Sequence, residues 1–423
     1  MPQLMSETLI TGCSQLVTLR GPAPRRGRAL SDLGIIRDGA LLLQDGMILA
    51  AGPRRVIERR REARRARKID VGGRVVMPGF VDSHTHLVFA ESRAAEYEQR
   101  IAGATYEQIA KSGGGILSSV RKLRAAPASD LKARAHARLR YFAAHGTTTL
   151  EAKTGYGLDF ANEIKTLEVM RELRLEQPLD IATTFLGAHV VAPEYRKHPK
   201  DYADLVARIW IPYVAHSGLA QFNDVFCDRG AFTLLQAEHI LGAGLVCGLT
   251  PRIHADQLSR TGAAQLAVKV RAASADHLEH INAGDISALA GSDVVCTLLP
   301  GCSFHLGESQ HVPARDLIDS GAIVALATDF NPGTSPTMNM QMVLSLACTQ
   351  LRMTPAETIV AATINPAYSL RRHQRTGSLE PGKIADIAVF DLADYREIPY
   401  YFGVNTCWMT FKRGEIVHSR QTV

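Results

Sequence analysis

The chain has 423 residues, more than one ordinary domain needs, and its apolar content of 46% can form a large core. Its seven cysteines are scattered without a CxxC pair, which disfavours a disulfide framework and a cysteine zinc site. It lacks both a secretion-signal pattern and the roughly 18 consecutive apolar residues of a membrane helix, so we expect no membrane partner and a cytoplasmic location.

The net charge of +6 comes from one segment. Residues 54–68, RRVIERRREARRARK, contain nine Arg or Lys and two Glu, which leaves the rest of the chain near neutral. Runs of like charge are usually solvated, and the spacing of Val56 and Ile57 favours an exposed surface helix. We therefore expect no nucleic-acid partner, although anion binding through 54–68 stays compatible with another function elsewhere in the chain.

The two ends of the chain have the pattern of short strands. GALLLQDGMILAAG (39–52) indicates two strands joined by an Asp-Gly turn, and GSLEPGKIADIAVFDL (377–392) and WMTFKRGEIVHS (408–419) indicate more strands with glycine turns. We predict that residues 1–77 and 380–423 together form a small β-sandwich domain.

Between these ends, short apolar runs alternate with stretches whose apolar residues recur at helical spacing. Eight such runs can be counted, at 75–87, 147–157, 180–190, 222–228, 251–257, 275–281, 293–301 and 322–333. The helical stretches include 160–176, 203–218, 231–244 and 261–273, and Thr354 with Pro355 and Glu357 predicts a capping box. This alternation predicts a parallel (β/α)₈ barrel over residues 78–379.

Polar residues gather at the carboxyl ends of these runs, which form one face in such a barrel. His84 and His86 share one face of their strand because they are two positions apart. An HxH pair by itself is weak evidence, but His254 and Asp329 end two later runs. Three imidazoles and one carboxylate suit a single zinc or iron ion with a position left for water, so we predict a metal site.

The motifs PGFVDSHTH (78–86), TDFNPG (328–333) and GSLEPGKIADIAVFD (377–391), together with His254, resemble the amidohydrolase superfamily of metal-dependent hydrolases. A closer resemblance, to the imidazolonepropionase family, covers nearly the whole chain. Six motifs carry it, at 84–116, 151–159, 185–195, 254–257, 275–280 and 327–340. The resemblance implies a homodimer that hydrolyses 4-imidazolone-5-propanoate to N-formimidoylglutamate in histidine degradation.

The resemblance also implies substrate-binding residues. Arg93 stands where the family binds the propionate carboxylate, and a guanidinium can bind a carboxylate through two hydrogen bonds. Tyr156 and His189 stand at ring-binding positions. Asn331, Gly333 and Thr334 lie in a Pro-Gly loop whose backbone groups are expected to hold the α-carboxylate that forms.

For the reaction, water attacks a cyclic carbonyl and a ring nitrogen departs. We expect Asp329 to carry the proton and His277 to stabilise the oxyanion or orient the water. Gln257 stands where some relatives have glutamate; a glutamine cannot accept a proton, so we assign it to ring recognition. Lys153 resembles the carbamylated lysine of two-metal relatives, but it ends the second run and the fourth run supplies none, which favours one metal ion.

Two other functions remain open from the sequence. One is a deaminase of the same superfamily that acts on a nucleobase-like ring, although Gln257 counts against it because deamination relies on a glutamate. The other is a non-catalytic relative that keeps the barrel as a binding module, although all four predicted ligand positions are occupied.

Overall fold

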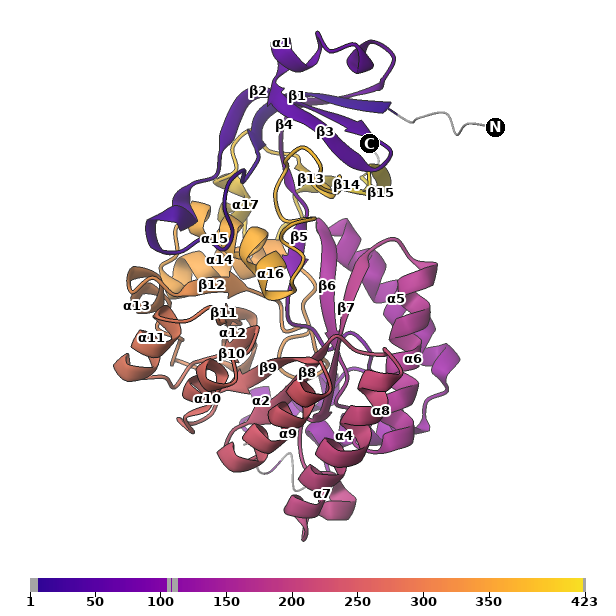
Figure 1. Ribbon diagram of the computed structural model, residues 1–423, viewed down its shortest axis with the longest axis vertical. Helices are drawn as coiled ribbons and strands as arrows, with labels where there is room; N and C mark the ends of the chain where they lie inside the picture. The colour runs from indigo at the N-terminus through magenta and orange to yellow at the C-terminus, as the bar shows by residue number, and fades with distance from the viewer. Residues whose placement is uncertain (1–6, 105–107, 109–112, 421–423) are drawn as a thin grey trace.

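The computed structural model describes residues 7–104, 108 and 113–420, so part of the motif at 84–116 lies outside the described residues. The chain forms a large strand-and-helix domain and a smaller sheet beside it (Figure 1). Within the described residues, no helix is long and apolar enough to cross a membrane.

The large domain is a barrel of eight parallel strands, as predicted. The strands are β5 (Phe80–Asp82), β6 (Thr147–Lys153), β7 (Asp180–Ala188), β8 (Phe222–Cys227), β9 (Thr250–Ala255), β10 (Ser274–His277), β11 (Val295–Leu298) and β12 (Ile323–Leu326). Beyond the ends of β5 and β12, the amide of His86 donates to the carbonyl of Phe330 at 2.8 Å and that of Asp329 to the carbonyl of His84 at 3.0 Å. These bonds join the first strand to the last.

Helices surround the strands (Figure 1). They are α2 (Ala94–Ile101), α4 (Ile116–Ala125), α5 (Ala128–Ala144), α6 (Phe160–Glu176), α7 (Pro199–Leu205), α8 (Ile211–His216), α9 (Leu234–Val246), α10 (Ala263–Lys269), α11 (Ala283–Ala290), α12 (Pro300–Leu306), α13 (Ala314–Asp319), α14 (Met340–Leu351), α15 (Pro355–Ala361) and α16 (Ile364–Ser369). The capping box at Thr354 is confirmed: its hydroxyl accepts from the amide of Glu357.

One helical stretch differs from the pattern. The segment predicted over 203–218 is divided into α7 and α8 by a π-helical turn, Val206–Trp210. Pro212 lies in the first turn of α8, where its missing N–H and its ring oppose a regular α-helical continuation.

The smaller sheet is built from both parts of the chain that flank the barrel. Its strands are β1 (Glu7–Val17), β2 (Ile35–Gln44), β3 (Met47–Pro53), β4 (Arg67–Pro78), β13 (Ile387–Phe390), β14 (Cys407–Lys412) and β15 (Glu415–Ser419). Hydrogen bonds link all seven into one continuous sheet, in the order β15-β14-β13-β4-β1-β2-β3. The short helix α17 (Glu397–Tyr400) precedes β14, and the domain boundaries at residues 77 and 380 stay a prediction.

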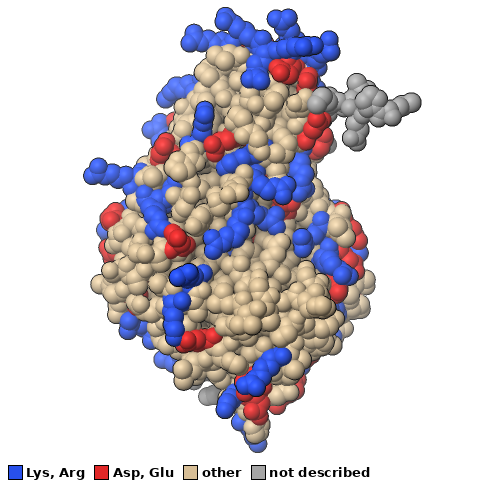
Figure 2. All heavy atoms as spheres, viewed as in Figure 1, with Lys and Arg blue, Asp and Glu red and all other residues tan. Residues whose placement is uncertain are grey.

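The Arg-rich segment does not form the surface helix that its spacing predicted. Only α1 (Arg54–Ile57) and a 3₁₀ turn (Glu62–Arg64) are helical, and β4 begins at Arg67. Within 54–68 only Ile57 and Ala63 are buried, too little apolar surface to dock a longer helix. Pairing of Arg67 with Thr8 of β1 then favours a strand. Basic side chains cover this end of the molecule (Figure 2).

Candidate functional site

The predicted metal ligands meet at the carboxyl end of the barrel. The Nε2 atoms of His84 and His86 lie 3.5 and 3.8 Å from Oδ1 of Asp329. The ring of His254 lies 4.5 Å from that of His84, centroid to centroid. Among the described residues, two overlapping groups offer ligand atoms within 4.8 Å of one another: His84, His254 and His277, and His84, His86 and Asp329.

The donor set fits a metal ion. Nε2 of His84 and Nε2 of His254 are buried and lack a hydrogen-bond partner within the described part of the chain. An unpaired buried nitrogen costs about 1–3 kcal/mol, so a ligand that accepts these lone pairs is favoured. Burial lowers the pKa of His84, His86 and His254, which keeps them in the neutral form that binds metals.

Two aspartates that the sequence analysis missed orient these imidazoles. Asp276 of β10 lies 2.7 Å from Nδ1 of His84, and both carboxylate oxygens of Asp224 on β8 lie 3.2 Å from Nδ1 of His254. A carboxylate at Nδ1 fixes the tautomer and points Nε2 into the mouth of the barrel. The only sequence signal was an acidic residue inside each apolar strand, FNDVFC and SADH.

Below the histidines lies a buried network of charged side chains. Nζ of Lys153 is 2.7 Å from both Glu151 and Asp224, and 3.5 Å from Asp276; Arg252 lies 3.4 Å from Glu151 and 3.6 Å from Asp276. All five side chains are fully buried. Burial opposes the charge of Lys153, but Asp224 and Glu151 outweigh it and raise its pKa. An ammonium held in this way resists carbamylation, in keeping with the prediction of one metal ion.

Asp329 has an unusual backbone conformation and a buried side chain. Its φ of 51° is unusual for a residue other than glycine, and burial raises the pKa of its carboxyl group to about 6. His277 has a φ of 82°. Burial disfavours its imidazolium, but Glu279, 3.8 Å from Nδ1, and Asp329 outweigh that effect and raise the pKa of His277. The two residues predicted to act in catalysis, Asp329 and His277, thus interact: the charge of each favours the ionised form of the other.

Arg93 lies over the loop that follows Asp329. Its amide donates to the carbonyl of Pro332 at 3.2 Å, and its guanidinium occupies the space that a Cβ on Gly333 would need. Arg93 is 8% exposed, and its nearest carboxylate, Glu96, is 3.8 Å away. Only a glycine at 333 leaves room for this arrangement, so Gly333 serves the position of Arg93.

The residues predicted to contact the substrate ring lie beside His86. His189 stacks on His86 with ring centroids 5.1 Å apart, and Tyr156 lies 5.4 Å from His189 and 5.7 Å from His86. Nδ1 of His189 donates to the carbonyl of Gly155 at 3.0 Å, and burial lowers its pKa to about 3. His189 is therefore neutral, with Nε2 as its acceptor.

The loop after Asp329 is organised by Asn331. Its Oδ1 accepts from the amides of Gly333 and Thr334 at 2.8 and 2.7 Å, and its Nδ2 donates to the carbonyl of Asp329 at 2.7 Å. The backbone donors that were expected to hold a carboxylate are thus engaged with Asn331 in this structure. On the other side, Nε2 of Gln257 lies 3.6 Å from the buried Sγ of Cys302, a neighbour that the sequence analysis also missed.

Comparison with known proteins gives closely similar relatives. The chain is 49% identical over 417 residues to an imidazolonepropionase of Solibacter usitatus, covering 98% of this chain and 100% of that protein. It is 47% identical over 417 residues to an imidazolonepropionase of Geobacillus thermodenitrificans, covering 98% of each. The profile of the Amidohydrolase family matches residues 253–417.

Solved structures with the same fold are more distant. An adenosine deaminase from Xanthomonas campestris with bound zinc has a TM-score of 0.73 at 15% identity, over 98% of this chain and 93% of that one. The guanine deaminase of E. coli has a TM-score of 0.72 at 15% identity, over 98% and 100%. At this identity the likeness shows the barrel fold alone.

Proposed function

The chain belongs to the imidazolonepropionase family of metal-dependent amidohydrolases, and on that premise we propose that it hydrolyses 4-imidazolone-5-propanoate to N-formimidoylglutamate, a step of histidine degradation. The observation that carries this proposal is the place of Arg93. Among the described residues its guanidinium has one carboxylate neighbour, Glu96 at 3.8 Å, and it lies over the loop that begins with Asp329. A cation beside a metal-binding cluster suits a small ring that bears a carboxylate.

We propose that His84, His86, His254 and Asp329 hold one ion, zinc or iron. The unpaired nitrogens of His84 and His254 and the carboxylate of Asp329 support this assignment. Such an ion, when bound, polarises a carbonyl and lowers the pKa of water from about 15.7 towards roughly 7. Asp276 and Asp224 keep the imidazoles of His84 and His254 in the orientation that binding requires.

We assign the proton transfers to Asp329. Its carboxylate lies at the mouth, within 4 Å of two histidines, and takes a proton from the attacking water before delivering it to the leaving ring nitrogen. His277 donates a hydrogen bond to the oxygen on which charge develops, since its raised pKa favours the protonated form. Glu279 positions that imidazole.

The other residues bind the substrate. Arg93 pairs with the propionate, and Tyr156 and His189 contact the ring beside His86. Gln257 offers an amide to the ring. Asn331 shapes the loop through Gly333 and Thr334, whose amides become donors to a carboxylate only if they leave Asn331.

The test is an assay of purified protein whose metal content has been measured by mass spectrometry. With about one zinc or iron per chain, absorbance of the imidazolone ring should fall and N-formimidoylglutamate should accumulate. Removal of the metal by a chelator should stop the reaction, and adding back zinc and iron in separate samples should show which ion restores it. Metal-loaded protein that leaves the imidazolone intact but releases ammonia from guanine, cytosine or adenosine would establish the deaminase instead.

The homodimer implied by the family and the cytoplasmic location stay predictions. Light scattering of the purified protein at several concentrations tests the dimer. A mass near 46 kDa at every concentration would contradict it.

A further inference from the structure

A second charged cavity lies at the opposite end of the barrel, at the amino ends of the strands. Its volume is about 500 Å³, and the end of α6, the starts of β7, β8 and β9, the segment after α16 and the β14–β15 turn surround it. We call it the arginine cavity; its charged lining residues are Arg174, Asp180, Arg371, Arg372, Arg375 and Arg413. Basic side chains gather at this waist between barrel and small sheet (Figure 2).

The charges of the arginine cavity do not balance. Asp180 is the one acidic residue that lines the cavity in the described part of the chain. It already forms ion pairs with Lys412 at 2.8 Å and Arg413 at 2.6 Å, and Arg372 lies 3.9 Å away. Within the described part of the chain, Arg174, Arg371 and Arg375 have no carboxylate oxygen within 4.0 Å. Three guanidinium groups therefore border the cavity without a protein counter-charge.

The pKa of Arg372 responds to the other charges around the cavity. Burial lowers the pKa of its guanidinium; Asp180 opposes that effect, and the positive charges of Arg174, Arg375 and Arg413 lower the pKa further. Neighbouring like charges raise the free energy of the folded chain unless an anion offsets them.

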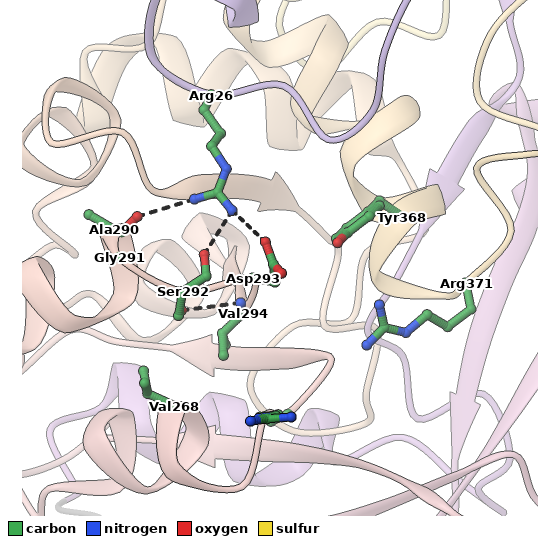
Figure 3. A pocket seen from close by; sticks show the side chains of 11 residues that line it. Arg26, Val268, Ala290, Gly291, Ser292, Asp293, Val294, Tyr368 and Arg371 are labelled. Atoms are coloured by element: carbon green, nitrogen blue, oxygen red, sulfur yellow. Dashed lines mark hydrogen bonds and ion pairs between the residues drawn. The ribbon is translucent and has the colours of Figure 1, made fainter.

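The neighbouring cavity shows how the protein itself satisfies one guanidinium group, although Arg271 and Arg371 line that cavity as well (Figure 3). There Arg26 donates to the carbonyls of Ala290 and Ser292 at 3.2 and 2.8 Å and to Asp293 at 2.8 Å, so its guanidinium is satisfied by the protein. Arg371 borders both cavities and lies 5.7 Å from the ring of Tyr368. A cation beside an aromatic ring is stabilised, and this side chain contributes to the lining of both cavities.

We propose that the arginine cavity binds a small molecule with two or more phosphate charges. Guanidinium groups bind phosphate oxygens through paired hydrogen bonds, and several of them around one space favour a multivalent anion over a single carboxylate. A cavity of about 500 Å³ is in the size range of small-molecule sites. This site is distinct from the mouth of the barrel, where Arg93 faces a monocarboxylate substrate.

The test uses inorganic pyrophosphate as the probe and calorimetry on the full-length protein, with ionic strength held constant by sodium chloride. The test variant is Arg174→Gln/Arg375→Gln, because both side chains are exposed and have no ion pair in the described chain to lose. The matched control is Arg64→Gln/Arg65→Gln, which removes two positive charges from the exposed Arg-rich segment instead. Citrate serves as a multivalent carboxylate.

We expect saturable binding of pyrophosphate to the wild type and to the control, and binding roughly tenfold or more weaker in the test variant. Unchanged circular dichroism and unchanged turnover of the imidazolone exclude misfolding of that variant. Absence of saturable binding to the wild type, or equal weakening in test variant and control, would overturn the site. Binding of citrate as tight as that of pyrophosphate would overturn the preference for phosphate.

Discussion

The two ends of the barrel both carry clusters of charge, but the cluster below the mouth is fully buried with its charges paired, whereas the one at the base is mostly exposed with an excess of arginine. Below the mouth, Lys153 and Arg252 are surrounded by Glu151, Asp224 and Asp276, so every cation has a carboxylate within 4.0 Å. At the base, five arginines border a cavity with one aspartate, which two of them and Lys412 already share.

The difference teaches where to look for ligands. A buried cluster in which every charge has an opposite partner within 4.0 Å needs nothing from outside, and it can fix the orientation of groups above it, as Asp276 does for His84. A cluster with excess charge beside a cavity is completed by an external ion. Arg93 at the mouth lies between the two cases, since Glu96 is 3.8 Å away and the same carboxylate oxygen accepts from the amide of Gly115 at 2.9 Å.

The largest effect should follow a change of Asp329 to Asn, which removes the proton carrier at the mouth and leaves the base intact. Because an amide cannot accept a proton, we expect turnover to fall by about 10²–10⁴-fold. Steady-state rates should be compared at equal measured metal content, with Asp293→Asn on the far face as the control. Turnover close to that of the wild type would mean that another group moves the proton.

Replacing Lys153 by Met would leave carboxylates of the mouth cluster without a cation beside them. Three buried carboxylates would then share only Arg252, and we expect the free energy of unfolding to fall by about 3–5 kcal/mol. Denaturant unfolding measures this. The matched control is Lys132→Met, whose ion pairs with Glu172 and Glu176 are exposed, so its change should stay below about 1 kcal/mol. Similar losses in both variants would contradict the distinction.

Gly333→Ala tests whether the position of the Arg93 guanidinium matters for substrate binding. The new methyl group overlaps the mobile end of Arg93, so the guanidinium must move while the backbone can stay. We expect KM to rise roughly 10- to 100-fold through weaker binding of the propionate, with stability changed by less than about 1 kcal/mol. Gly242→Ala, where a Cβ has open space, is the control. An unchanged KM would remove Arg93 from substrate binding.

The smallest effect is expected at the base, from Asp180→Asn. Burial raises the pKa of Asp180, but Lys412, Arg413 and Arg372 outweigh it and lower the folded-state pKa. Its stabilisation, about 1 kcal/mol, is therefore present above the unfolded pKa of about 3.9 and is lost as pH falls through the folded value.

Thermal unfolding between pH 3 and pH 7 should show this loss in the wild type and a flatter profile in Asp180→Asn. The substitution also removes the one acidic residue that lines the arginine cavity in the described part of the chain, so pyrophosphate should bind at least as tightly as to the wild type. Weaker binding, or an unchanged pH profile, would contradict this account.

The sequence by itself determined the barrel, because eight apolar runs alternate with helical stretches, and it placed His84, His86, His254 and Asp329 at strand ends that the fold brings together. It also determined the capping box of α15, which depends on residues three positions apart. Local rules failed for residues 54–68: a helix there would need apolar contacts, and pairing of β4 with β1 favoured a strand instead.

Only the tertiary structure decided which charges are paired. Asp276 and His84 are 192 positions apart, and the arginine cavity combines α6, β7, the segment after α16 and the β14–β15 turn. The energy of a charge depends on its burial and on distances of a few ångströms to its neighbours, and neither is encoded in the local pattern. The fold therefore leaves one cluster of this barrel with every charge paired and the other with an excess of arginine.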